Sequence, residues 1–205
     1  MNLIKPDDQA TIVKYVDTNY VGIQSLNISR CAIGYDIRGT KHIYYGDTRH
    51  SISHGEVFYL GFGNHYVEDM PDDGRPFEQI VLYYSPEQLQ QILLNLNMGY
   101  SINIATSHSC DRCRRHNHIS MVATPTLRNI FTHIQNYLHE DSQVHDAAAD
   151  KLKMTELIYA VVAMEECCLR SKMLSNVDAA HGSFEQIIYN NIFNDISIEV
   201  LADMT

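Results

Sequence analysis

The stretch that decides the fold is residues 54–66, which read HGEVFYLGFGNHY. A short run of β-branched and aromatic side chains, residues 57–60, lies between Gly55 and Gly61. Such side chains favour extended backbone, and glycines are frequent in the tight turns that end strands. The stretch therefore predicts a short β-strand between two turns.

The same pattern extends in both directions over the first ninety residues. Short apolar or β-branched segments alternate with glycines and polar turns at 26–37, 41–45, 48–53, 56–60, 65–70 and 77–84. Gly46-Asp47 lies between two of them and suits a two-residue hairpin turn with positive φ. No helical periodicity interrupts the block. We therefore expect antiparallel strands that form a barrel or a sandwich.

Helical signals begin at residue 85. Ser85, Pro86 and Gln88 form a capping box with proline at the first helical position, and leucines and isoleucines follow at helical spacing. Further helices are predicted to begin after Thr124, to run over about residues 147–169, and to begin after Ser183. The chain thus combines a β block with a helical block, which makes it an α+β protein.

Composition and charge limit the function further. The chain has 205 residues with 15 Lys+Arg against 25 Asp+Glu, hence a formal net charge of −10, and 45% of its residues are hydrophobic. This apolar content excludes wholesale disorder, and the acidic balance argues against extensive contact of these residues alone with duplex DNA. Neither a basic, apolar leader nor an apolar run of about 18–20 residues is visible. We therefore expect a cytoplasmic protein that does not engage a membrane.

Three segments of the β block, IGYDIRG at 33–39, YYGD at 44–47 and the stretch 54–66, resemble the sensor barrel of AraC-type transcriptional regulators. The tail ISIEVLA at 196–202 resembles the first helix of the paired helix-turn-helix domain of that family, with Ser197, Leu201 and Ala202 in its scaffold helix. The resemblance implies a cupin-like antiparallel β-barrel of the double-stranded β-helix type over residues 1–85. A helical dimerisation segment would follow over 86–175, and the start of a DNA-binding domain, cut short, over 183–205.

This resemblance implies the effector-sensing and dimerisation part of a transcription factor. The intact protein is expected to bind DNA, to form a homodimer through its helical segment and to respond to an unknown small-molecule effector. The recognition helix and the second helix-turn-helix are missing from the sequence, which leads us to expect a truncated polypeptide. We expect no enzymatic activity, because no paired carboxylates, nucleophile elbow or phosphate-binding glycine loop is present.

Four residues are candidates for contact with the effector: His65, Tyr66, Gln79 and Tyr83. His65 and Tyr66 follow a glycine turn and are expected at the mouth of the barrel, although a histidine there also suits a simple bond to a loop carbonyl. Gln79 and Tyr83 share one face of a strand by period-two alternation. If that face points inward, Gln79 is placed to hydrogen-bond a ligand, and if outward it is solvated.

Asp36 and Arg38 lie two residues apart on a predicted strand. The simpler interpretation is a salt bridge at the surface, which contributes little to stability. The alternative is a buried pair that recognises a polar ligand.

The densest chemical cluster is SHSCDRCRRHNH at residues 107–118. Cys110, Cys113, His116 and His118 offer a Cys2His2 set that could bind zinc, the one cofactor that the sequence suggests. A reversible thiol pair or a metal-free polar loop are the alternatives, and the three neighbouring arginines oppose a cation. The adjacent Cys167 and Cys168 are expected to pack as small apolar side chains.

Two other functions therefore stay open. One is a zinc or thiol sensor centred on the Cys110–Cys113 loop. The other is a metal-dependent cupin-type enzyme that acts on a small molecule, although the barrel segments lack the His-x-His pair and following glutamate that such enzymes use. Metal analysis combined with an activity screen separates the enzyme from the regulator.

Overall fold

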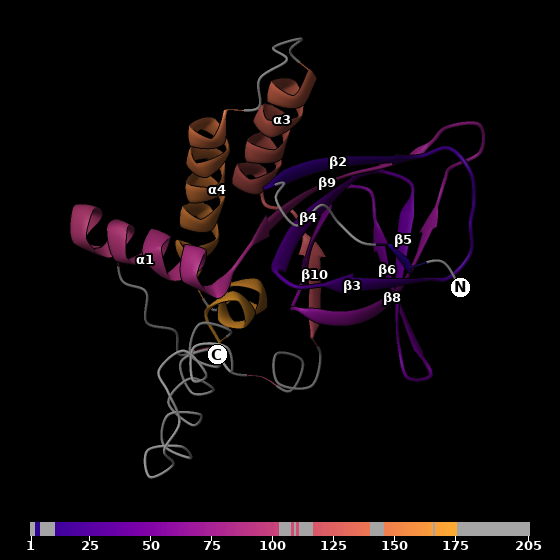
Figure 1. Cartoon of the computed structure of the whole chain (residues 1–205), viewed down its shortest axis with the longest axis horizontal. Coiled ribbons are helices and arrows are strands. Elements are labelled where there is room, and N and C mark those ends of the chain that lie inside the picture. Colours follow the sequence, from indigo (N-terminus) through magenta and orange to yellow (C-terminus); the bar gives the residue numbers. More distant parts are fainter. Residues whose placement is uncertain are drawn as a thin grey trace, which may run out of the picture.

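A computed structural model describes residues 3–4, 11–102, 108, 110, 117–139, 146–165 and 167–175 of the chain (Figure 1). The strands are β1 (Leu3–Ile4), β2 (Ile12–Asp17), β3 (Gln24–Ile28), β4 (Cys31–Arg38), β5 (Thr40–Tyr45), β6 (Thr48–Ser53), β7 (Glu56–Leu60), β8 (Gly63–Met70), β9 (Phe77–Tyr84) and β10 (His118–Val122). The helices are α1 (Pro86–Tyr100), α3 (Pro125–His139) and α4 (Ala147–Val162), and a further helix covers residues 168–175.

The strands form two five-stranded sheets, and the predicted antiparallel barrel is confirmed. One sheet has the order β1-β3-β8-β5-β6 and the other the order β10-β7-β4-β9-β2. Neighbouring strands are antiparallel except for β1 and β3, which are parallel. Sequence neighbours such as β6 and β7 belong to different sheets, as in the double-stranded β-helix that the sequence led us to expect.

A helical layer covers one face of the β10-β7-β4-β9-β2 sheet (Figure 1). Along β7, Val57 and Tyr59 pack into the core shared with the helices, whereas Phe58 and Leu60 pack into a second core between the two sheets. Both faces of β7 are therefore buried. This explains why the decisive stretch is apolar at four consecutive positions instead of alternating with polar residues.

The first helix begins as the sequence predicts. The backbone N–H of Gln88 donates a hydrogen bond to the Ser85 hydroxyl oxygen at 3.2 Å. In return, the backbone N–H of Ser85 donates one to the side-chain oxygen of Gln88 at 2.9 Å. The buried face of this helix consists of Leu89, Ile92, Leu93 and Leu96.

The turn at Gly46 is also confirmed, because Gly46 has a φ of 56° between the paired residues Tyr45 and Thr48. Within the described residues, no helix has both the length and the apolar character that a bilayer crossing requires.

The structure differs from the sequence-based expectation in one helix and in several strands. The helix expected over 147–169 ends at Val162, and a new helix starts at Cys168. Both pieces are apolar, so composition does not mark the break between them. The segment expected over 26–37 forms two strands, β3 and β4. Three strands were not predicted: β1, β2, whose residues are mostly half-buried, and β10, which pairs with β7 and so carries the barrel sheet past the boundary expected at residue 85. Residues 183–205, including Ser197, Leu201 and Ala202, lie outside the described residues.

Candidate functional site

The space between the two sheets contains a cavity of about 210 Å³. An engineered apolar cavity of about 150 Å³ binds benzene, so this volume suits a molecule somewhat larger than benzene. Strands of both sheets contribute its lining: Tyr15, Asp17, Gln24, Leu26, Lys41, Phe58, Leu60, Val67, Asp69, Gln79, Val81 and Tyr83.

A glycine on β4 makes room for one wall of this cavity. Gly34 lies opposite Val81 in the β4–β9 pair, on the face that points between the sheets. A Cβ atom at Gly34 would lie 2.1 Å from Cζ of Phe58, which is far closer than two carbon atoms can approach. The absence of a side chain at position 34 therefore lets the Phe58 ring lie across β4 and line the cavity.

The lining of the cavity includes a buried ion pair. Lys41 has 2% of its side chain exposed, and its Nζ atom lies 2.5 Å from Oδ1 of Asp69 on the neighbouring strand β8. The same ammonium group lies 5.4 Å from the ring centre of Phe77 and 5.9 Å from that of Phe58. A buried charge is tolerated when it is paired in this way. The pair adds a strongly polar point to a wall that also contains the polar side chains of Asp17, Gln24 and Gln79.

A second polar group, Asp36, lies deep between the sheets. It is directly opposite Gln79 in the β4–β9 pair and is fully buried. Among the described residues, neither carboxylate oxygen of Asp36 has a hydrogen-bond partner, nor does Oε1 of Gln79. Burial raises the pKa of Asp36 well above its ordinary value, although the nearby Lys41 opposes this shift. Burial therefore favours the protonated form of the Asp36 carboxyl group.

The predicted surface pair between Asp36 and Arg38 is wrong. A β-bulge separates the two residues, so they do not share the register that the spacing implies. Arg38 instead donates to Glu78 at 2.7 Å on the adjacent strand, while Asp36 turns into the barrel.

The predicted effector residues divide into two groups. Gln79 and Tyr83 face the cavity, and the Tyr83 hydroxyl lies 2.9 Å from that of Tyr15. Burial raises the pKa of Tyr83, which therefore stays a neutral hydroxyl. His65 and Tyr66 do not line the cavity. His65 is buried with its Nε2 atom 2.6 Å from the Gly61 carbonyl oxygen, as the simpler interpretation required, and Tyr66 is 47% exposed.

Burial also lowers the pKa of His65, and the bond to the Gly61 carbonyl only partly opposes this shift. The contact between the His65 ring and the Gly61 carbonyl joins β8 to the loop before it. Among the described residues, nothing around His65 directs its side chain toward a ligand. The sequence reasoning missed the other cavity residues, among them the charged pair Lys41 and Asp69. The sequence contains one indication of these two residues, which is a charged side chain at a strand position that alternation places on the inward face. A charged residue in a strand is usually solvated, so this indication is easily taken for an ordinary surface position.

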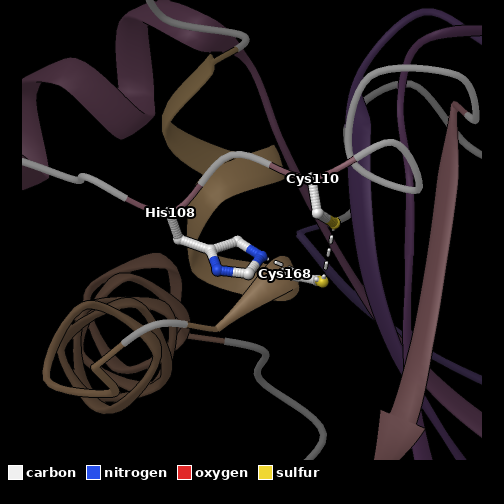
Figure 2. A group of neighbouring side chains, drawn as sticks. All are labelled: His108, Cys110 and Cys168. Carbon is white, nitrogen blue, oxygen red and sulfur yellow. Dashed lines mark hydrogen bonds between the residues drawn. The ribbon is translucent and has the colours of Figure 1, made fainter.

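A separate group of potential metal ligands lies outside the barrel interior. Nε2 of His108 and the sulfur atoms of Cys110 and Cys168 all lie within 4.8 Å of one another (Figure 2). Of the zinc set expected from the sequence, Cys113 and His116 lie outside the described residues. His118 is buried on β10, where its ring packs against the ring of His50 at 4.6 Å between centres.

The fold is a cupin-like barrel with a helical layer on one sheet and a cavity between its two sheets. The sequence model of the ExsA N-terminal regulatory domain matches residues 32–166. The chain belongs to this family of regulatory domains of AraC-type transcription regulators. The resemblance noted in the sequence is thereby confirmed, and the chain represents the effector-sensing part of such a regulator.

Several solved structures are similar to the chain. The apo form of a ToxT variant from Vibrio cholerae strain SCE256 matches 97% of this chain and 71% of its own, with 8% identity and a TM-score of 0.50. Wild-type ToxT from the same strain, with bound unsaturated fatty acid, matches 98% and 70% with 9% identity and a TM-score of 0.47. The AraC-like activator CuxR matches 86% and 57% with 14% identity and a TM-score of 0.45. No curated protein matches the chain.

Proposed function

We propose that the cavity between the sheets is the effector site of this regulatory domain. The observation that carries the proposal is Oε1 of Gln79, a buried acceptor in the cavity wall that has no hydrogen-bond partner among the described residues. Buried polar atoms are normally paired, and a largely apolar pocket with a few polar groups is the usual form of a small-molecule site. A ligand that donates a hydrogen bond to Gln79 would satisfy this atom.

The charges around the cavity define the class of effector. The lining contains one lysine and two aspartates, and Lys41 is already paired with Asp69. Burial, together with the charge of Asp69, raises the pKa of Asp17, the remaining acid. A carboxylate ligand would therefore meet no unpaired cation in the lining. The site favours a neutral or cationic molecule with a hydrogen-bond donor and an apolar ring or short chain.

Three probes of nearly equal size test this class: benzylamine, benzyl alcohol and benzoate. In isothermal titration calorimetry at pH 7 we expect the amine and the alcohol to bind more tightly than benzoate. Gln79→Leu should weaken their binding about tenfold, because it removes one hydrogen bond to the ligand. Tyr66→Ala, on an exposed side chain that does not line the cavity, is the control and should leave binding unchanged.

Tighter binding of benzoate would contradict the proposed charge class. Failure of all three probes to bind, or equal losses in Gln79→Leu and Tyr66→Ala, would contradict the location of the site.

The proposal also assigns the dimer contact to the helical segment, residues 86–175. Tyr100, Leu152 and Tyr159 are exposed apolar side chains that border a groove of about 510 Å³ between α1 and α4. A second copy of the chain would cover this apolar surface, as is typical of such patches.

Leu152→Glu should shift the mass measured by light scattering from dimer to monomer. Val122→Glu is the matched control, since Val122 and Leu152 are 69% and 70% exposed. A monomeric parent protein would contradict the assignment.

In the intact protein, effector binding and DNA binding would be coupled through this dimer, in the cytoplasm where the DNA lies. The proposal includes no enzymatic step. Among the described residues, the group of three potential metal ligands is His108, Cys110 and Cys168, and none of these lines the barrel cavity. The structure therefore lends no support to the alternative of a metal-dependent cupin-type enzyme.

A further inference from the structure

Two distant parts of the chain meet at the His108–Cys110–Cys168 cluster. His108 and Cys110 follow α1, whereas Cys168 is the first residue of the helix 168–175, 60 and 58 residues further along. Figure 2 shows the side chains of His108 and Cys110 each joined by a dashed line to the sulfur of Cys168. Nε2 of His108 lies 3.3 Å from Sγ of Cys168, and the sulfur atoms of Cys110 and Cys168 are 3.6 Å apart.

Two of the three separations match the edges of a zinc coordination tetrahedron, and the third, between His108 and Cys110, is no longer than 4.8 Å. With Zn–S of about 2.3 Å and Zn–N of about 2.0–2.1 Å, tetrahedral angles separate two sulfur ligands by about 3.8 Å and sulfur from nitrogen by about 3.5–3.6 Å. The observed distances of 3.6 and 3.3 Å are shorter by only about 0.2–0.3 Å. A disulfide needs sulfur atoms about 2.05 Å apart, so the two sulfurs would have to approach by about 1.5 Å.

We propose that His108, Cys110 and Cys168 form a binding site for a thiophilic divalent cation of the zinc class. Nε2 of His108 and the two sulfur atoms supply three ligands, and the fourth position of the tetrahedron is open to a further donor. On binding, the two thiols each release a proton to solvent and the imidazole stays neutral. Two thiolates then balance the two positive charges of the cation.

The surroundings hold the first ligand in place. The Ser171 hydroxyl, on the same helix as Cys168, donates a hydrogen bond to the carbonyl oxygen of His108 at 2.8 Å. This contact ties the backbone of the histidine to the helix that supplies the cysteine, so both ligands move together. Such outer contacts orient the ligands of metal sites.

The two adjacent cysteines have different surroundings. The sulfur of Cys167 lies 3.6 Å from that of Met121, and Cys167 packs against the main hydrophobic core. Both cysteines pack against the main hydrophobic core, as predicted, and the sulfur of Cys168 in addition lies beside Cys110 and His108. Cys167 is a matched control for any test of Cys168.

The site would act on the last helix that the structure describes. Seven residues, 176–182, separate the helix 168–175 from the part of the sequence that resembles the start of the DNA-binding domain. A metal ion that joins this helix to residues 108 and 110 would fix the point from which the chain leaves the regulatory domain. This inference does not depend on the barrel cavity, and its test is separate from that of the effector site.

Metal analysis of the purified 205-residue chain tests the site. After incubation with Zn²⁺ and gel filtration, we expect about one zinc per chain in the parent protein and in Cys167→Ser. Cys110→Ser and Cys168→Ser should retain at least tenfold less zinc. Co²⁺ added to the metal-free parent protein should produce thiolate-to-cobalt charge-transfer and strong visible absorption, a readout that requires no variant. Thermal unfolding of the metal-free proteins checks that the variants fold.

Three results would overturn the proposal. The first is a parent protein that retains no zinc and gives no cobalt spectrum. The second is Cys168→Ser that keeps its zinc, or Cys167→Ser that loses it to the same degree. The third is a non-reduced protein about 2 Da lighter with Cys110 and Cys168 in one linked peptide, which would identify a disulfide in place of the metal site.

Discussion

Replacing Asp69 by Asn should strongly destabilise the barrel, because it leaves the ammonium group of Lys41 buried without a counter-charge. Lys41 is 2% exposed and its partner Asp69 10% exposed, with 2.5 Å between the charged atoms. Removing one member of a buried pair costs about 3–5 kcal/mol. Lys41→Met should cost less, since Asp69 has more access to water. The double variant Lys41→Met/Asp69→Leu should recover most of the loss, because apolar side chains replace both charges.

Urea unfolding followed by circular dichroism at pH 7 measures these free energies of unfolding. The control is the Arg38–Glu78 pair, which has the similar separation of 2.7 Å but leaves 34% of the arginine side chain exposed. Arg38→Met should cost only about 0–1 kcal/mol, since Glu78 also keeps Lys14 at 3.2 Å. The reasoning is refuted if Asp69→Asn costs no more than Arg38→Met, or if the losses of the two single variants simply add in the double variant.

Three further predictions address single residues. Because burial raises the pKa of Asp36, the folded chain keeps a proton that the unfolded chain releases above about pH 4, so the free energy of unfolding should decrease as the pH rises. Asp36→Asn should flatten that decrease in urea titrations between pH 4 and 8, and an unchanged slope would contradict the assignment. Gly39→Ala should cost at least about 1 kcal/mol, because φ is +86° and the new Cβ would lie 2.6 Å from the Met70 carbonyl oxygen. Gly22→Ala, with φ of +79° in open space, should cost less in the same urea assay, and equal costs would argue against the close contact. His118→Asn should retain zinc, since His118 packs against His50, whereas zinc loss would restore the ligand set expected from the sequence.

The parts of the fold that follow from local rules could be predicted from the sequence. The turn at Gly46 and the cap at Ser85 depend on residues within four positions of each other, and alternation places Gln79 and Tyr83 on one face. Lys41 could not be predicted as a cavity residue, because lysine is almost never buried and its partner Asp69 lies 28 residues away. The pairing of β5 with β8 creates that contact.

The metal ligands show the same limit in a sharper form. The spacing of Cys110 and Cys113 suggests that one short loop supplies a complete zinc set, yet the described structure places Cys168 beside Cys110. The break between α4 and the helix 168–175 sets this contact, and no glycine or proline marks it in the sequence. A site that joins two segments closes a long loop, so it restricts the unfolded chain more than a site within one short loop would. Metal binding by Cys168 would therefore stabilise the junction of the two segments, which a set confined to residues 110–118 could not do.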